Sequence, residues 1–534
     1  MKFLSFLSYR KFLFSFFVAI FPISLTLFSS DLDKVAIKND FYLQYNDITG
    51  PGKKNSSLVD GLRYFNIFNY YKKGKLKKYK YIINLGLKAT DNRKKDPKDI
   101  SITNMQITLK NKINTFRVGD VFESFSQYSL NTALKGVSYR YLSKDITNQL
   151  QIVYGIAYPR WDSFWDNKTK AIKRSVYGTR YRRKILDGKM DIGVSFVYSN
   201  DKDRIFGGVP LYNNHLYTMD INYIPIPDLD IYSEFSHSNN TKNTSDTTAN
   251  ENFSGNAFKI RAIGNKNPSR VLVEYERVSP YYITLTGSAT PDREKFKTSW
   301  RYKATKKIVT HIGFLWYRND LDGQLIDRKD VYRPSIGITY KKAFGRRHNT
   351  IDLTYKLDIT DTTNNITNHI IDFSMSDRFA KIYNTTNISY YSYKTDGNIQ
   401  DSHEFRINTQ FNGKIRKKDY IFKPSLYIGS RSNKDELKSS LDKYYEASIG
   451  LGVDVMKYRL SGKLKIGENK SDRDLSDDSK KVFLNLNIYY RPKIFFSFKR
   501  VMIYARAFYN DFTYTTNTKN FRERGTILGV RIRF

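Results

Sequence analysis

Strict alternation of apolar and polar residues, in segments of about ten residues, runs along the chain from near residue 41 to its end. In the last segment Leu528, Val530 and Ile532 alternate with Gly529 and Arg531. Successive side chains of a β-strand point to opposite faces, so this period predicts strands with one apolar and one polar face. We count about 26 such segments, which predicts an all-β fold. Clear examples lie at 190–198, 351–359, 405–411, 445–453, 458–466 and 484–490.

The connections between these segments alternate between short and long. Short ones lie at 72–75, 186–189, 224–228, 304–306 and 491–493. Long ones, rich in Asn, Thr, Ser, Asp, Gly and Lys, lie at 91–100, 157–172, 201–213, 237–253, 278–293, 319–330, 467–479 and 510–522. This arrangement is typical of a transmembrane β-barrel with short periplasmic turns and long extracellular loops. Because backbone groups in hydrocarbon must all be paired, such strands close on themselves. We therefore expect one large antiparallel barrel of 24–26 strands over residues 31–534.

A soluble all-β protein, either a chain of sandwich domains or a propeller, is the main alternative, because its strands also alternate. Three features of the sequence weigh against it. The long and short connections alternate in register, and no repeat of 40–50 residues recurs as a propeller needs. Aromatic pairs such as Tyr70-Tyr71, Trp316-Tyr317 and Tyr489-Tyr490 also lie at strand ends, as aromatic girdles at membrane interfaces require.

The first 30 residues have the pattern of a secretory signal peptide. Lys2, Arg10 and Lys11 precede an apolar stretch from Phe12 to Phe28, and the first acidic residue is Asp31. This order predicts a signal peptide over residues 1–30 and export from the cytoplasm. An uncleaved anchor helix is the alternative. The formal charge of +38 would fall to about +35 on cleavage, and export argues against nucleic acid as its partner.

Composition excludes several chemistries. The chain has no cysteine, so thiolate metal sites, disulfides and a Cys nucleophile are excluded. Its six histidines form no HExxH or similar metal spacing, and no G-x-S-x-G elbow occurs. The acidic stretch 471–478 lacks the glycine of a calcium-binding EF-hand loop and is interpreted as a solvated loop. We expect neither enzymatic activity nor a cofactor or metal.

The end of the chain resembles bacterial outer-membrane β-barrel proteins, whose last strand alternates apolar residues and finishes on an aromatic residue. The resemblance rests on Leu528, Val530, Ile532 and Phe534. It implies a Gram-negative outer-membrane location, with outer-membrane lipid around the barrel. It also implies that these four residues form the signal read by the barrel-assembly machinery during biogenesis.

Residues 114–141 form the most distinctive local feature. Gly119-Asp120 is expected to break a strand, and an apolar stretch follows before a strand resumes at Gly136. An apolar connection is a poor solvent-exposed loop, so we expect it to fold into the lumen as a constriction. An extracellular loop packing on its own aromatic residues is the alternative. The constriction residues would be Asp120, Phe122, Phe125, Tyr128 and Leu130.

This stretch is similar to one found in several families of large outer-membrane barrels, including fimbrial ushers. The similarity covers fewer than 30 residues and its spacing is loose. The periplasmic domains of an usher and the plug domain of a TonB-dependent transporter are not recognised in the sequence. The similarity therefore supports a barrel and adds little about function.

The polar face of the strands would line the lumen, and its cations exceed its acids. An excess of cations favours anions in a pore. A compositional bias toward Lys, Asn, Ile and Tyr is the alternative explanation. The lumenal cations expected from the alternation are Arg140, Arg180, Arg182, Lys259, Arg261, Lys295, Lys297, Arg301, Arg406, Arg459, Lys463, Lys465, Arg506, Arg531 and Arg533.

The function expected first is that of an outer-membrane channel, or transporter, which passes polar solutes, anions among them, through a constricted lumen. A barrel of this width needs a filled or gated lumen, because 16–18-stranded porins already enclose an aqueous channel. A second hypothesis is a barrel that exports or assembles surface proteins or polymers. It would bind a periplasmic or lipoprotein partner at the basic short turns. A third is a surface-binding protein anchored by its barrel.

Overall fold

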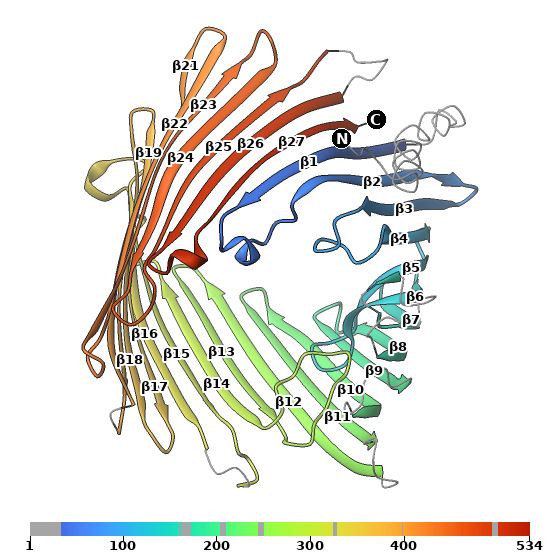
Figure 1. Cartoon of the computed structure of the whole chain (residues 1–534). Helices are drawn as coiled ribbons and strands as arrows, with labels where there is room; N and C mark the ends of the chain where they lie inside the picture. The colour runs from blue at the N-terminus through green and yellow to red at the C-terminus, as the bar shows by residue number, and fades with distance from the viewer. Residues whose placement is uncertain are drawn as a thin grey trace.

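The computed structural model describes residues 34–158, 160–161, 172–202, 210–243, 250–323, 328–397, 399–493 and 500–533. The expected signal peptide and the terminal Phe534 lie outside these residues. Within them the chain forms one antiparallel sheet in which each strand pairs with its sequence neighbour. Figure 1 shows this sheet curling round on itself.

Most strands are longer than the ten residues expected. In order they are β1 Lys34–Thr49, β2 Gly61–Leu76, β3 Tyr79–Thr90, β4 Ile100–Lys110, β5 Asn114–Ser124, β6 Asn131–Leu142, β7 Asn148–Ile156, β8 Lys173–Ile185, β9 Met190–Lys202, β10 Leu211–Ile226, β11 Leu229–Asn243, β12 Asn250–Lys266, β13 Ser269–Val278, β14 Arg293–Tyr302, β15 Ile308–Arg318, β16 Asp330–Lys341, β17 Thr350–Asp361, β18 Ile366–Phe379, β19 Ile382–Thr395, β20 Gln400–Gly413, β21 Ile415–Lys417, β22 Tyr420–Asp435, β23 Ser440–Val455, β24 Leu460–Asp472, β25 Ser479–Tyr490, β26 Arg500–Tyr514 and β27 Phe521–Arg533.

Pairing of the first strand with the last closes the sheet into a barrel. β1 pairs antiparallel with β27, from Lys38 opposite Arg533 to Thr49 opposite Arg522. β20 and the three-residue β21 pair with different parts of the same strand, β22, so together they count as one strand of the barrel. The expected single antiparallel barrel is confirmed, and it has 26 strands when β20 and β21 are counted as one.

The two ends of the barrel differ in their connections. The start of β1, the end of β27 and twelve connections, most of them two to five residues long, share one end, which we call the short-connection end. The thirteen connections at the other end are longer on average, although 362–365, 396–399 and 436–439 have four residues each.

Several sequence expectations about boundaries are wrong, and 224–228, 467–479 and 510–522 each lie partly within strands. Two are the clearest. Residues 72–75 lie within β2, and the turn is Lys77–Lys78. Most of 237–253 is strand, with only 244–249 between β11 and β12. Both errors have one cause. A strand continues through polar residues as long as the neighbouring strand can form backbone hydrogen bonds with them.

The outer surface of the barrel carries the apolar face of the alternation. Leu528 is 61% exposed, as is Ile449, and Tyr177 is 55% exposed. In water such a surface would be unfavourable over this area, whereas hydrocarbon accepts it. Helical structure in the described part of the chain consists of the short 3₁₀ turns Lys53–Asn55, Ala343–Gly345 and Asn517–Lys519, and none of its helices is long and apolar enough to cross a membrane.

Buried apolar side chains gather inside the barrel instead of between layers. A cluster joins residues of the β5–β6 connection to inward side chains of β7 through β13. Its members include Phe125, Tyr128, Leu130, Val197 and Leu216, all at most 5% exposed. The position of this cluster directs attention to the lumen.

Candidate functional site in the barrel lumen

The β5–β6 hairpin leaves the barrel wall part-way along its length. β5 pairs with β4 only as far as Gly119 opposite Gln106, although β5 itself continues to Ser124. Gly119 has φ 106°, and a Cβ there would lie 2.1 Å from the carbonyl oxygen of Met105. Only glycine accepts this geometry. The expected strand break at Gly119-Asp120 is therefore wrong as a break in β5, but this is where β5 separates from β4.

Asp120 compensates for the pairing that ends at this point. Its carboxylate accepts a hydrogen bond from the backbone N–H of Met105 at 2.6 Å and forms an ion pair with Lys135 at 2.9 Å. The indole N–H of Trp161 donates to the same carboxylate at 2.8 Å. A strand N–H that would otherwise lack a partner is satisfied, so the hairpin can leave the wall without a buried orphan donor.

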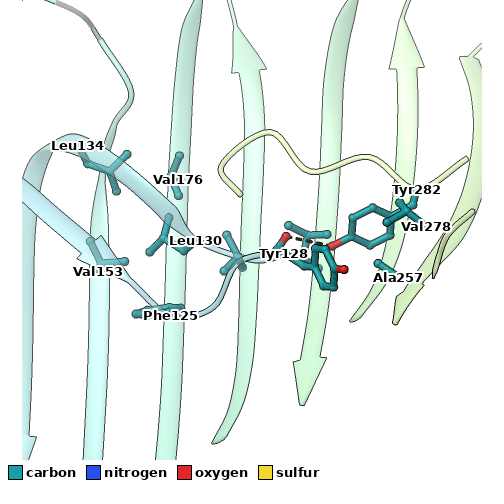
Figure 2. Packing of buried hydrophobic residues seen from close by; sticks show 11 residues of the cluster. Phe125, Tyr128, Leu130, Leu134, Val153, Val176, Ala257, Val278 and Tyr282 are labelled. Atoms are coloured by element: carbon teal, nitrogen blue, oxygen red, sulfur yellow. Dashed lines mark hydrogen bonds between the residues drawn. The ribbon is translucent and has the colours of Figure 1, made fainter. Parts of the chain in front are cut away.

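The hairpin tip, residues 125–130, packs on the inner surface of the barrel wall. Tyr128 and Leu130 are fully buried, against wall residues such as Val176 and Leu216. Figure 2 shows the tip running across several strands with its side chains directed at the wall. The wall is shaped to receive it, because a Cβ at Gly178 would lie 2.9 Å from the ring of Phe125.

A second segment, the β13–β14 connection 279–292, lies in the lumen and binds the hairpin tip. Its Tyr282 hydroxyl donates to the carbonyl of Tyr128 at 3.0 Å, as Figure 2 shows, and lies 2.9 Å from Ser236 Oγ. Backbone hydrogen bonds join Asn131 N–H to Thr286 at 2.8 Å and Ser288 N–H to the Gln127 carbonyl at 2.7 Å. The two segments form one unit, which we call the lumenal clasp (125–131 with 279–288).

Charged groups of the wall also hold the clasp. The buried Glu234 accepts from the backbone N–H of Tyr128 at 3.0 Å, and Lys259 donates to the Gln127 side chain at 2.9 Å. Glu123, 3% exposed, accepts from Ser138 at 2.8 Å and forms ion pairs with Arg117 and Arg140. Because these polar groups sit in a water-poor site and are satisfied there, the clasp has a defined position.

Burial raises the pKa of both clasp tyrosines. For Tyr128 desolvation is the main cause, followed by the nearby carboxylates of Glu276 and Glu234. Desolvation is likewise the main cause for Tyr282. Both hydroxyls therefore stay protonated at physiological pH, so the Tyr282 hydroxyl remains a donor.

The five residues expected to form a constriction take three different places. Phe125, Tyr128 and Leu130 lie in the clasp, buried against the wall. Asp120 lies where the hairpin leaves the wall. Phe122 is 60% exposed, on the opposite face of the hairpin from Glu123, so it points away from the wall. The sequence thus predicts part of the clasp, whereas it predicts an ordinary long loop for the second half, the 279–292 segment. Its uncharged run from Tyr281 to Ala289 was the signal that could have identified it.

The predicted lumenal cations, with one exception, lie on the inner face of the sheet. Lys259 contacts the clasp inside the barrel, and residues that pair across a ladder share a face. The cross-strand pairs round the barrel place fourteen of the fifteen on that inner face. Arg459 is the exception, because it lies in the short connection 456–459 with φ 53°. The fourteen are Arg140, Arg180, Arg182, Lys259, Arg261, Lys295, Lys297, Arg301, Arg406, Lys463, Lys465, Arg506, Arg531 and Arg533.

On the wall near the clasp, several of the cations are paired with acids. Arg180 binds Asp220 at 2.7 Å, both about 9% exposed. Lys295 bridges Glu274 and Glu276 at 3.0 and 2.7 Å. Arg182 also pairs with Asp191. Pairing of this kind neutralises these particular cations locally.

The opposite wall is more basic and less covered. β24 stands half-way round the barrel from β10. Its inward Lys463 and Lys465 line a recess of about 240 Å³ together with Tyr427 and Glu446. Toward the loop end a second recess, of about 460 Å³, is lined by Arg406, Arg431, Tyr444, Arg473, Lys481 and Phe512. Toward the turn end a third, of about 520 Å³, is lined by Lys423, Lys463 and Arg491.

These recesses follow one another along the inner wall, and we call their cations the basic track (Arg473, Lys481, Lys465, Lys463, Lys423 and Arg491). Aromatic rings shape its upper part. The Arg431 guanidinium lies 5.0 Å from the Tyr444 ring centre, and Lys481 Nζ lies 5.0 Å from that of Phe512. Rings that stack on cations hold these side chains against the wall. The arrangement can attract and pass negative charge.

Other sites are not formed by the described residues. No group of three or more His, Asp or Glu side chains able to hold a metal occurs among them. His311 lies on the inner face within β15, whereas His403 lies on the outer face of β20, with its Nδ1 3.0 Å from the Tyr390 hydroxyl. Of the predicted assembly signal, Leu528, Val530 and Ile532 lie on the outer face of β27, while Phe534 lies outside the described residues.

No family model matches the chain, and no curated protein matches it. Among solved structures, the P pilus usher PapC translocation pore shows a TM-score of 0.36 at 7% identity, covering 93% of this chain and 99% of that one. The outer membrane transporter YddB from Escherichia coli gives 0.44 at 7%, covering 95% and 81%. A BenF-like porin from Pseudomonas fluorescens Pf-5 gives 0.31 at 9%, covering 94% and 99%. At such identities the likeness assigns neither solute nor partner.

Proposed function

We propose that this chain is an outer-membrane channel that passes small polar anions through its lumen, between the lumenal clasp and the basic track. The observation that carries this proposal is the basic track itself. Cations follow one another on one inner wall from the loop end to the turn end. Within the described part of the chain five of the six form no ion pair, and the sixth, Lys423, pairs with Asp454. An anion crossing the barrel therefore meets successive positive groups on one side.

The spacing of the track suits transport better than tight binding. A pore must attract its solute strongly enough to enter but weakly enough to leave, which several weak sites in series achieve. Lys463 and Lys465 are two residues apart on one face of β24, and both reach the same recess. Glu446 lines that recess too, so its net attraction for an anion is moderate.

The membrane location rests on the outer face of the barrel. Large apolar side chains cover this face on strands all round the sheet, and every strand edge is paired. Both properties suit hydrocarbon and neither is required in water. The apolar alternation of β27 and the leader-like residues 1–30 favour the bacterial outer membrane.

The test is electrical. Purified protein added to a planar bilayer is expected to give discrete conductance steps. Under a tenfold KCl gradient, the reversal potential should have the sign that shows preferred passage of chloride. Insertion without conductance steps, or a cation-selective reversal potential, would contradict the proposal.

A pair of matched variants tests the track. Lys463→Gln with Lys465→Gln removes two inward charges and is expected to shift the reversal potential toward zero and to weaken anion preference roughly twofold or more. The control is Lys434→Gln with Lys438→Gln, which removes two charges at the loop end of β22 and lies outside the residues that line the three recesses. The control should leave selectivity unchanged, and an equal shift in both variants would show that overall charge, not the track, sets selectivity.

A further inference from the structure

The two ends of the barrel differ strongly in charge. The twelve short connections lie at the end that holds the start of β1 and the end of β27. With residues 414–417, which include the short strand β21, counted together with 418–419, they contain 20 Lys or Arg among their described residues. Against these stand four acids, Asp145, Asp187, Asp228 and Asp419. We call these cations the basic rim. The described residues of the connections at the other end carry 12 Lys or Arg and 12 Asp or Glu.

A general abundance of lysine does not explain this difference. A compositional bias acts on both ends of the same strands, yet the described residues are balanced at one end and in excess by 16 charges at the other. The excess of cations is therefore specific to the short-connection end of the barrel. Its charge is also free to act outward, because all 20 side chains are exposed.

The rim cations are not engaged with acids of their own chain. Arg346 pairs with Asp377 at 2.8 Å. For the other nineteen, no ion pair is found within the described part of the chain. Like charges at this density repel one another unless an external anion neutralises them. The rim is therefore built for an anionic partner.

Large apolar side chains stand beside these cations. Phe344 is 78% exposed in the connection that holds Arg346 and Arg347. Tyr458 is 60% exposed beside Lys457, and Leu186 is 57% exposed near Lys189. Cations next to exposed apolar and aromatic side chains are the composition of a membrane interface, where the apolar part enters the lipid and the charge meets the headgroups.

The rim runs round the barrel instead of forming a patch. Ten of the twelve short connections carry at least one described cation. The two without, 227–228 and 267–268, flank β11 and β12. A docked protein covers one arc of such a circle. A lipid leaflet surrounds the whole circumference, so the distribution favours lipid.

We propose that the basic rim binds the anionic phospholipid headgroups of the leaflet at the short-connection end, and that it fixes the depth and orientation of the barrel in the membrane. Basic groups beside a membrane attract anionic lipids through this charge within about a Debye length. The inference relies on the membrane location in the proposed function and is independent of which solute passes through the lumen.

The experiment measures lipid selectivity directly. The purified full-length protein is reconstituted into phosphatidylcholine vesicles containing spin-labelled phosphatidylglycerol or spin-labelled phosphatidylcholine, and the motionally restricted fraction of each is recorded. Symmetric vesicles present lipid to the rim in either orientation. Phosphatidylglycerol is expected to associate at least about twofold more strongly in low salt. In 1 M salt, where the Debye length is about 3 Å, the ratio should fall toward one.

Two matched quadruple variants locate the effect. Lys306→Gln, Lys307→Gln, Lys417→Gln and Lys418→Gln remove four rim charges and should lower the ratio. The control removes four exposed cations from the other end, at Lys53, Lys54, Lys95 and Lys329, and should leave the ratio as in the natural chain. Both variants are expected to conduct, since neither touches the basic track.

Three results would overturn the proposal. These are a ratio of one for the natural chain, an equal fall in both variants, or an acidic protein that copurifies only when the rim is intact while the lipid ratio is one. The last would assign the rim to a protein partner. Conductance is measured independently of lipid selectivity in all three cases. Failure of the lipid-binding proposal and failure of the channel proposal are therefore distinguishable.

Discussion

At the scale of single residues, the hydroxyl of Tyr282 joins the two halves of the lumenal clasp. It donates to the Tyr128 carbonyl at 3.0 Å in a fully buried site. A buried hydrogen bond contributes about 1 kcal/mol, and the cost rises when its removal leaves the partner unsatisfied. This hydroxyl thus adds to the backbone hydrogen bonds that hold a segment from β5–β6 to one more than 150 residues away.

Tyr282→Phe removes this hydroxyl while keeping the ring. We expect the backbone amides of 125–131 and 279–288 to exchange with deuterium roughly fivefold faster, as about 1 kcal/mol less local stability implies. Hydrogen exchange followed by mass spectrometry measures this. Tyr281→Phe is the control, because Tyr281 is 46% exposed, and its exchange should match that of the natural chain. Unchanged exchange in Tyr282→Phe would show that the ring alone holds the clasp.

Individual residues were also where sequence reasoning was least complete. A Gly-Asp pair is a common signal for the end of a strand. The sequence does not show that β5 continues past Gly119 and Asp120 and that only its pairing with β4 ends there. That outcome depends on Met105 and Lys135, which supply the partners of Asp120 from neighbouring strands. Arg459 was misplaced for a similar reason, since the position of a turn within an alternating run depends on where the two strands stop pairing.

At the scale of elements, alternation identified the strands because each has one face toward an apolar medium and one toward a polar one. The 279–292 segment gave no such signal, since its role follows from contacts with the distant β5–β6 hairpin. The inner wall that receives the clasp breaks the rule that inward residues are polar. Val176, Val197 and Leu216 point inward there, and short-range pattern does not reveal why until the hairpin is seen to cover them.

Removal of the hairpin tests whether the clasp narrows the lumen. Asp120 and Lys135 pair directly across the hairpin, so residues 121–134 can be replaced by Asn-Gly, which forms a two-residue turn. Single-channel conductance is expected to rise about twofold or more, because fourteen residues leave the lumen. For comparison, 436–439 can be replaced by Asn-Gly between the paired Asp435 and Ser440. Conductance equal to that of this control would mean that the hairpin does not obstruct passage.

At the scale of the whole molecule, one property governs all the others, namely that the outer face meets hydrocarbon and the inner face meets water. Two adjacent residues of β27 test this property, because they lie at nearly the same depth in the barrel but on opposite faces. Leu528 is 61% exposed on the outer face, opposite Leu43 of β1. Ile527 lies on the inner face, opposite Gln44 and Arg506.

Leu528→Arg places a charge on the outer face near the middle of β27, where arginine in a bilayer costs about 2–4 kcal/mol. We expect much less folded barrel after refolding into lipid vesicles, measured as the fraction that migrates in the heat-modifiable form on a gel. Ile527→Arg adds the same side chain to the wet lumen and should refold nearly as well as the natural chain, apart from mild repulsion from Arg506. If both variants refold equally, or Ile527→Arg is the more damaged, the outer face does not contact lipid, and the channel and the lipid-binding rim both fail with it.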